Sequence, residues 1–151
     1  MSNSTAINKA EIRTLIPHSG LMCLLDEVTQ WDDRSITCIT NTHRDPANPL
    51  RRDGRLSSVH AFEYGAQAAA VHGGLRARLV GEIAPPGYLA ALRDAELHTA
   101  RLDDIELRRV QARVAQGSQI TRRRECIHQT GPQSAMHCRR LRAVFESMQS
   151  R

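Results

Sequence analysis

The sequence predicts an α+β fold in which one antiparallel sheet wraps around a single long helix. The segment from about Ser57 to Arg76 is rich in Ala, contains no Pro and is apolar or small on nearly all sides, which is typical of a buried helix. Two segments before it and four after it show the alternation and the β-branched residues of strands. This order of elements favours a sheet packed on one helix.

The first part of the chain predicts a short helix followed by a hairpin. Residues 1–8 are expected to form a flexible tail, and Lys9 to Ile16 can form a helix that ends before Pro17. Asp26 to Trp31 and Ser35 to Thr42 are predicted to be strands, because both segments alternate and a polar Asp-Asp-Arg turn joins them.

A loop is predicted between this hairpin and the long helix, and further strands are predicted after the helix. His43 to Arg55 contains two Pro, one Gly and several Arg, so we expect an exposed loop there. A helix competes with a strand for the segment Ile105 to Ala115, because its residues are good helix formers. The predicted later strands are Tyr88 to Thr99, Ile105 to Ala115, Ile120 to Thr130 and Ala135 to Phe145.

Composition sets broad limits on the function. The 151 residues are expected to form one domain. The formal net charge of +5 suits nucleic acid, an anionic membrane or an acidic protein partner, and simple solubility explains it equally well. Nucleic-acid binding is not expected, because the chain has neither zinc-finger spacing nor the aromatic signature of an RNA-binding sheet.

The cysteines and the N-terminus indicate a cytoplasmic protein. The four Cys residues form no CxxC pair, so we expect reduced thiols without disulfides or a metal site, and we expect no other cofactor. The polar N-terminus does not look like a signal peptide. No apolar run reaches the ~20 residues that a membrane span needs.

Glu63 is the first candidate for an active-site group. It is the only Asp, Glu, Lys or Arg between Leu56 and Leu75, and so it is the one charge on the predicted buried helix. A charge in that position is costly unless it is paired or takes part in chemistry. The competing interpretation is a structural acid that pairs with an arginine such as Arg51 or Arg55.

Two segments resemble the hotdog-fold 3-hydroxyacyl-ACP dehydratases. Leu15-Ile-Pro-His-Ser-Gly-Leu-Met-Cys-Leu-Leu-Asp-Glu-Val28 resembles the family's entry into its first strand, and Phe62-Glu-Tyr-Gly-Ala-Gln67 resembles the E-x-x-A-Q motif of its central helix. The resemblance implies a hotdog fold, in which an antiparallel sheet wraps a long central helix. It also places Glu63 and Gln67 on the positions of the motif.

The chain departs from the common dehydratases in the loop before the helix. Those enzymes place a catalytic His in a Gly-His-Phe-Pro-Gly loop, whereas residues 48–56 read Asn-Pro-Leu-Arg-Arg-Asp-Gly-Arg-Leu and contain no His. The chain is more similar to the shortened branch found in aryl-polyene and related pigment clusters. The missing His leaves the catalytic base to be found elsewhere.

The implied dehydration needs a base for the α-proton and an acid for the departing hydroxyl. We expect Glu63 to be the acid, Gln67 to support it, and the free N–H groups of the helix start to bind the thioester carbonyl. His18, in the first motif, is the leading candidate for the base. His43 and His60 are the alternatives, and a purely structural role for His18 stays open.

Three functions remain possible at this point. The leading one is dehydration of a 3-hydroxyacyl thioester on an acyl carrier protein, with Arg51, Arg52 and Arg55 as the docking site for the acidic carrier. The second is thioester hydrolysis, in which Glu63 activates water. The third is a non-catalytic subunit that supports another dehydratase. Each is compatible with a homodimer, or with a heterodimer of two hotdog proteins.

Overall fold

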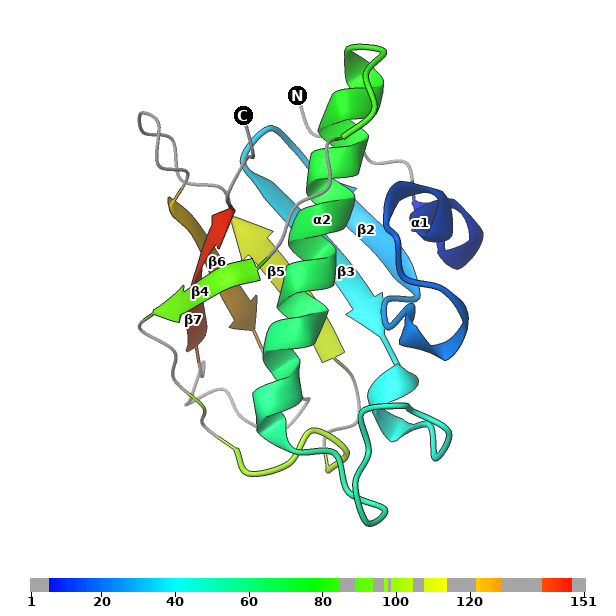
Figure 1. Ribbon diagram of the computed structural model, residues 1–151, viewed down its shortest axis with the longest axis vertical. Coiled ribbons are helices and arrows are strands. Elements are labelled where there is room, and N and C mark those ends of the chain that lie inside the picture. The colour runs from blue at the N-terminus through cyan, green and yellow to red at the C-terminus, as the bar shows by residue number, and fades with distance from the viewer. Residues whose placement is uncertain are drawn as a thin grey trace.

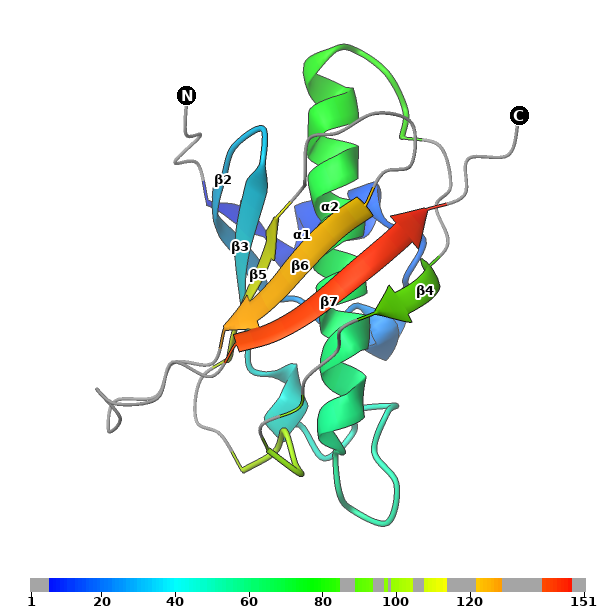
Figure 2. The ribbon, with the colours of Figure 1, turned by 90° about the vertical axis from the view of Figure 1, so that its left-hand side faces the viewer.

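The structure is a computed structural model and describes residues 6–84, 89–93, 97, 99–104, 108–113, 122–128 and 140–147. Within these residues a long helix lies across a curved antiparallel sheet (Figure 1, Figure 2). The strands are β1 (Ile7–Asn8), β2 (Glu27–Trp31), β3 (Ser35–Thr40), β4 (Leu89–Arg93), β5 (Arg108–Arg113), β6 (Arg122–His128) and β7 (Arg140–Ser147). The helices are α1 (Lys9–Leu15) and α2 (Ala61–Leu79), with short 3₁₀ turns η1 (Gly20–Met22), η2 (Thr42–Arg44) and η3 (Ser58–His60).

The described strands form one sheet in the order β1-β2-β3-β5-β6-β7-β4. Every neighbouring pair is antiparallel, which confirms the predicted α+β class. The described part of the segment with two competing predictions, Arg108–Arg113, is a strand, because β5 pairs along its whole length with β3. Val110 and Ala112 of β5 are buried and Arg109 is exposed, as the alternation predicts.

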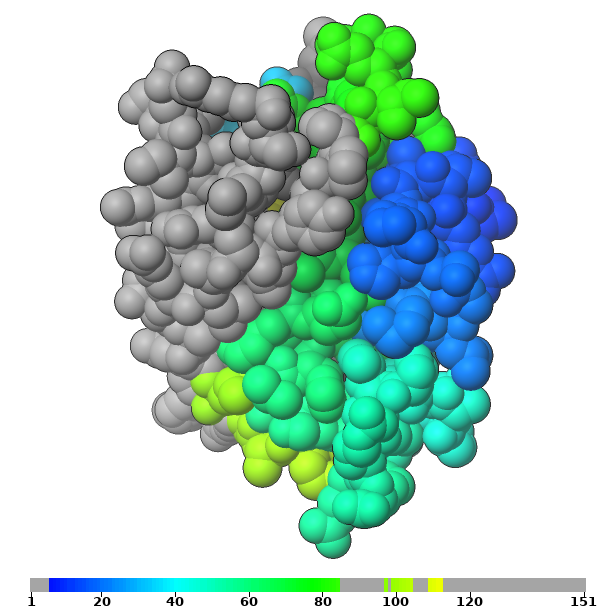
Figure 3. Space-filling view, viewed as in Figure 1, coloured from blue at the N-terminus to red at the C-terminus, as the bar shows by residue number. Residues whose placement is uncertain are grey.

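Helix α2 packs one side on the sheet and leaves the other side accessible. The buried side includes Tyr64, Gln67, Ala68, Val71 and Leu75. Figure 3 shows residues of α2 reaching the surface as a band beside the N-terminal segment. The prediction of a helix buried all round is therefore wrong for the single chain, because its own sheet covers only one side of the helix.

The N-terminal segment is more ordered than predicted. Ile7 is buried and pairs with Val28, so the predicted tail of residues 1–8 is too long. The side chain of Asn8 accepts a hydrogen bond from the N–H of Glu11 and caps α1. Helix α1 then ends at Leu15, whose side chain lies so close to Gly74 of α2 that a Cβ there would stand 3.1 Å from it. Gly74 is thus needed for contact between two helices.

The loop between β3 and α2 is not the fully exposed segment that its composition predicts. His43 and Asn48 are buried in it, and Asn48 donates a hydrogen bond to the carbonyl of Thr42 at 2.8 Å. Buried polar groups that bond to the backbone give an irregular segment a fixed conformation. This loop therefore forms a rigid support in front of the start of α2.

No helix in the described part of the chain is long and apolar enough to cross a membrane.

Candidate active site

The structure brings the two leading site residues together. Nε2 of His18 lies 3.2 Å from Oε1 of Glu63, although the two residues come from separate segments. His18 follows α1, and Glu63 lies in the first turn of α2. Their side chains are 30% and 32% exposed, so in the single chain a substrate can reach this pair from the uncovered side of α2.

Gln67 holds Glu63 in place with an amide whose orientation the backbone fixes. Its Oε1 accepts from the N–H of Leu24 at 2.9 Å, and its Nε2 donates to the carbonyl of Met22 at 2.8 Å. The second hydrogen of Nε2 is donated to Oε1 of Glu63 at 2.9 Å. Because the N–H of Leu24 can only donate and the carbonyl of Met22 can only accept, the amide cannot turn over.

A buried chain of hydrogen bonds extends from Gln67 into the loop before α2. The carbonyl of Leu24 accepts from the hydroxyls of Thr40 at 2.5 Å and Thr42 at 2.7 Å. The Thr42 hydroxyl also lies 3.0 Å from the hydroxyl of Tyr64, to which the side chain of Asn48 donates at 2.9 Å. Hydrogen-bonded networks of this kind fix the positions of their members. The segment that presents His18 is thereby tied to the helix that presents Glu63.

The surroundings of His18 indicate which ring nitrogen holds the proton. Nδ1 is buried and has no hydrogen-bond partner among the described residues. A buried N–H without an acceptor is rarer and more costly than a lone pair without a donor. We therefore assign the proton of neutral His18 to Nε2, which faces Oε1 of Glu63. The pair then consists of a carboxylate beside an N–H donor.

The two alternative bases are placed differently from His18. Within the described residues the polar contacts of the Glu63 carboxylate are with His18 and Gln67. His43 is 0% exposed inside the loop before α2, so a substrate cannot reach its ring in this conformation. His60 precedes α2 and lines a surface pocket. The structure thus brings one of the three candidate histidines to the acid.

The start of the central helix is less open to a ligand than the sequence predicts. The N–H of Ser58 donates to the carbonyl of Ala100 at 3.1 Å, and the N–H of His60 donates to the carbonyl of Ser57 at 3.2 Å. The N–H of Ala61 bonds within the 3₁₀ turn. These donors are therefore already used, because a 3₁₀ turn satisfies groups that an α-helix start leaves free.

The three predicted docking arginines divide into two kinds. Arg51 is built into the loop: its guanidinium donates to the carbonyls of Asp45 and Gly54 at 2.8 and 2.7 Å, and to the carboxylate of Asp103 at 3.3 Å. Its side chain is 14% exposed. Arg52 and Arg55 are exposed. Of the three arginines, Arg52 and Arg55 therefore present their side chains to solvent, and Arg51 keeps the loop in shape.

Asp103 is a central residue of this region that the sequence reasoning missed. Its carboxylate accepts from the N–H of Leu56 and pairs with Arg51 and Arg101, at 2.6 Å in the latter case. The hydrogen bond from Arg101, assisted by the one from Leu56, holds the pKa of Asp103 well below its usual value. The residues around Asp103 in the sequence gave no sign of this role, because its contact with Arg51 joins two distant segments of the chain.

No cluster of His, Cys, Asp or Glu able to hold a metal ion occurs among the described residues. Cys23 and Cys38 are free and buried, and burial raises the pKa of Cys38 above its usual value. Cys126 and Cys138 have side chains outside the described set.

Two comparisons with known proteins found similar proteins, one through a family model and one through a solved structure. A protein-family model described as "ApeP-like: ApeP dehydratase" matches residues 10–136. The chain is also similar to a solved structure titled "The Dehydratase Heterocomplex ApeI:P from Xenorhabdus doucetiae", at 21% identity and with a TM-score of 0.71, over 90% of this chain and 88% of that one. This likeness confirms the hotdog fold. No curated protein matches the chain.

Proposed function

The chain belongs to the ApeP-like dehydratase family, and from this premise we propose that it converts 3-hydroxyacyl thioesters on an acyl carrier protein into trans-2-enoyl thioesters. The observation that carries the proposal is the contact of 3.2 Å between His18 and Glu63 on the accessible side of α2. Dehydration needs one group that removes a proton and one that supplies a proton, within reach of the same substrate. This pair meets the requirement.

The proposed reaction starts from the Glu63 carboxylate and the Nε2–H form of His18. Oε2 of Glu63 removes a proton from the carbon beside the thioester carbonyl, and the electrons of that C–H bond form the carbon–carbon double bond. The bond from the next carbon to its hydroxyl oxygen breaks as Glu63 passes the proton that it has taken to that oxygen, while the Nε2–H of His18 donates a hydrogen bond to the same oxygen, and water leaves. Glu63 is then a carboxylate again, and His18 has stayed neutral throughout.

These roles differ from those expected from the sequence, where Glu63 was the acid and histidine the base. Gln67 favours Glu63 as the base, because its Nε2–H can only donate to Oε1 of Glu63, which leaves Oε2 available to accept the substrate proton. His18 favours it as well, since its Nδ1 is buried and only Nε2 faces the accessible side of the pair.

Product analysis tests the proposal. The protein is incubated with a 3-hydroxyacyl thioester on a carrier protein, and the carrier is examined by mass spectrometry for the loss of one water. An enoyl thioester supports dehydration. Release of a free acid, with unloaded carrier left behind, would instead support the thioesterase alternative, in which Glu63 activates water and His18 is not needed.

We also propose that a second hotdog chain, identical or different, covers the accessible side of α2. The single chain leaves Glu63 and His18 about one-third exposed, and water exclusion strengthens the electrostatic contacts of such a site. The similar solved structure is a dehydratase heterocomplex, which favours a different partner. Sedimentation of the protein alone and with co-expressed hotdog proteins tests the choice. A monomer that is fully active alone would contradict the proposal.

The carrier protein is proposed to dock at Arg52 and Arg55. Both side chains are exposed in the loop that leads into α2, and acidic carriers are steered by positive charge. Such carrier-bound synthesis, of polyene or fatty-acid-like chains, fits a cytoplasmic enzyme.

A further inference from the structure

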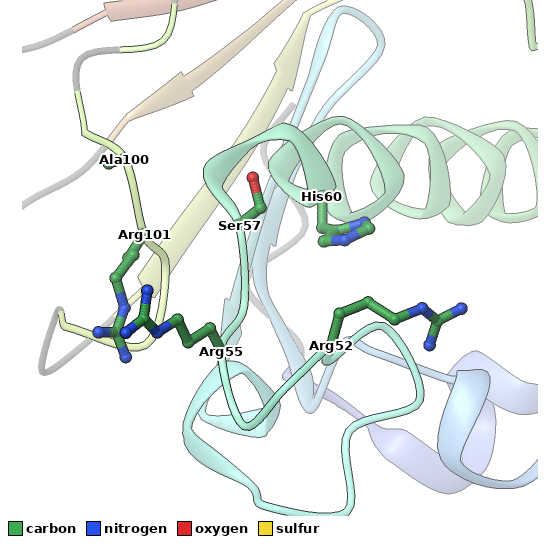
Figure 4. Close-up of a pocket in the computed structure, with 6 residues that line it drawn as sticks. All are labelled: Arg52, Arg55, Ser57, His60, Ala100 and Arg101. Carbon is green, nitrogen blue, oxygen red and sulfur yellow. The ribbon is translucent and has the colours of Figure 1, made fainter.

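A tight turn places two arginines opposite each other before α2. The N–H of Arg52 donates to the carbonyl of Arg55 at 2.9 Å, and the N–H of Arg55 donates back at 2.9 Å. Asp53 and Gly54 between them have positive φ angles of 49° and 71°, as in a type I′ turn. The turn thus fixes the backbones of the two arginines beside each other, while Figure 4 shows their side chains directed away from one another, so that they reach different ends of one surface region.

A third arginine is brought to the same place by a distant segment. Arg101 forms a bridge opposite Ser57, and the N–H of Leu102 donates to the carbonyl of Leu56 at 2.8 Å. Asp103 holds the Arg101 side chain with two hydrogen bonds, from Nε at 3.1 Å and from Nη2 at 2.6 Å. These two hydrogen bonds fix the orientation of the guanidinium group, and its Nη1 atom can still donate to a ligand.

The three arginines line one surface pocket of about 360 Å³, together with Ser57, His60 and Ala100. Figure 4 shows the side chains of Arg55 and Arg101 directed toward one another at one end of the pocket, and Arg52 and His60 at the end nearer to α2. Glu63 lies three residues beyond His60, which is about one helical turn further along α2. The end of the pocket that His60 lines therefore lies at the start of the helix that carries Glu63.

Two of the three arginines of this pocket form no ion pair with an acid among the described residues. Arg101 pairs with Asp103, and also with Asp104 at 3.6 Å. Arg52 donates to the carbonyl of Arg51, and the guanidinium of Arg55 has no hydrogen bond to a described residue. An anion bound beside Arg55 would therefore meet a positive charge that no described acid neutralises.

We propose that this pocket binds the phosphate of a phosphopantetheine thioester, with Arg55 and Arg101 as its main ligands. The inference rests on the proposed function for the identity of the arm. A phosphate offers several acceptor oxygens, which match convergent guanidinium forks better than a single carboxylate does. From the Arg55–Arg101 end the arm would run past His60 and bring its thioester toward Glu63. Carrier proteins and coenzyme A both present such an arm.

Binding of two small molecules tests the pocket without any turnover. Calorimetry compares 4′-phosphopantetheine with pantetheine, which lacks the phosphate. The unmodified protein should bind the phosphorylated compound about tenfold more tightly or better, since hydrogen bonds between charged groups are individually strong. Arg55→Ala should abolish this preference, and Arg101→Ala should reduce it. Arg76→Ala, which removes an exposed arginine from the far half of α2, should leave it unchanged.

Equal binding of both compounds by the unmodified protein would overturn the pocket assignment, as would an unchanged preference in Arg55→Ala. Arg55 makes no side-chain hydrogen bond or ion pair to a described residue, so its variant decides the matter even if Arg101→Ala unfolds. Dehydration of a 3-hydroxyacyl pantetheine thioester tests the proposed function separately, because that substrate has no phosphate. Turnover of carrier-bound and coenzyme A substrates by Arg55→Ala is then compared with turnover by the unmodified protein. The substrate whose turnover falls more is the one whose phosphopantetheine arm the pocket binds.

Discussion

The Nε2 atom of Gln67 donates to Oε1 of Glu63 at 2.9 Å, one helical turn along α2. The amide that provides this donor is 0% exposed, and the backbone groups of Met22 and Leu24 fix its orientation. Gln67 therefore does more than pack beside the acid. It requires Oε1 to be an acceptor, which leaves Oε2 as the oxygen available for a substrate proton.

The variant Glu63→Gln should lose activity while keeping its fold. The new amide oxygen can still accept from Gln67, so we expect nearly unchanged thermal stability, but an amide cannot take up a proton at neutral pH. Turnover of a 3-hydroxyacyl thioester should fall ~10²–10⁴-fold, the usual contribution of one general acid or base. Steady-state kinetics and a melting curve measure the two effects. Near-normal turnover in a folded variant would exclude Glu63 from the chemistry.

The variant Gln67→Glu should change the pH dependence of the reaction. One of its oxygens can still accept from Leu24, but the other would face the Met22 carbonyl and the Glu63 carboxylate, which are both acceptors. Two carboxylates that share a site repel each other, so the acid limb of the pH–rate profile should move to higher pH in this variant.

Gln67→Met is the matched control for that shift. It removes the same hydrogen bonds without adding a charge, and so it should lower the rate without moving the acid limb as far. Melting temperatures of both variants report any loss of folding at this buried position. If the profile of Gln67→Glu overlays that of the unmodified protein, Gln67 does not control the protonation of Glu63.

Much of the fold could be predicted because its signals are local. The alternation in β5 and the turn residues between β2 and β3 lie within single segments. The accessible side of α2 could not be predicted, because a small-residue helix has the same composition whether its own sheet or a second chain covers it. The role of Asp103 was also hidden, since its partner Arg51 lies 52 residues away in the sequence.

The two motifs predicted that His18 and Glu63 belong together, and the fold places them 3.2 Å apart. Their catalytic roles are a proposal, and the proposed roles differ from those predicted from the sequence. Which of them starts with the proton depends on the backbone groups that orient Gln67 and on the burial of the His18 Nδ1 atom. Neither feature is a property of side-chain spacing along the chain, and both follow from tertiary structure.

His18→Ala tests the second member of the pair. If the Nε2–H of His18 donates a hydrogen bond to the departing hydroxyl, its removal should lower turnover about as far as Glu63→Gln does. The double variant should then fall little further, because groups that act as a unit are not additive. A lower melting temperature with activity retained by the folded protein would instead show a structural His18. Arg76→Ala, at an exposed position in the far half of α2, is the control and should leave turnover unchanged.

Asp103→Asn should make stability less dependent on acidic pH. The pKa of Asp103 lies below its usual value of 3.8 in the folded protein. Its contribution is therefore present above that value and is lost as the pH falls through the lower, folded-state pKa. The variant should melt at a lower temperature than the unmodified protein at neutral pH, and the difference should shrink in acid. A constant difference across this range would mean that the ionised carboxylate is not what stabilises the loop.

Charge reversal at the loop tests carrier docking. Arg52→Glu should slow turnover of a carrier-bound substrate and should change turnover of a short thioester without carrier only slightly. Arg51 is not suitable for this test, because its guanidinium holds the loop and the variant would disturb the helix start. Arg76→Glu applies the same charge change at an exposed position in the far half of α2 and should leave both rates nearly unaffected.

Salt dependence separates docking from a role inside the site. Attraction between exposed charges is screened over ~10 Å at 0.1 M salt, so added salt should lower the apparent affinity of the unmodified protein for the carrier substrate. Arg52→Glu should show a weaker salt dependence, because part of the steering charge is already lost. If Arg52→Glu lowers turnover of both substrates equally at all salt concentrations, Arg52 supports the helix start instead. Arg52 would then not be a docking residue for the carrier.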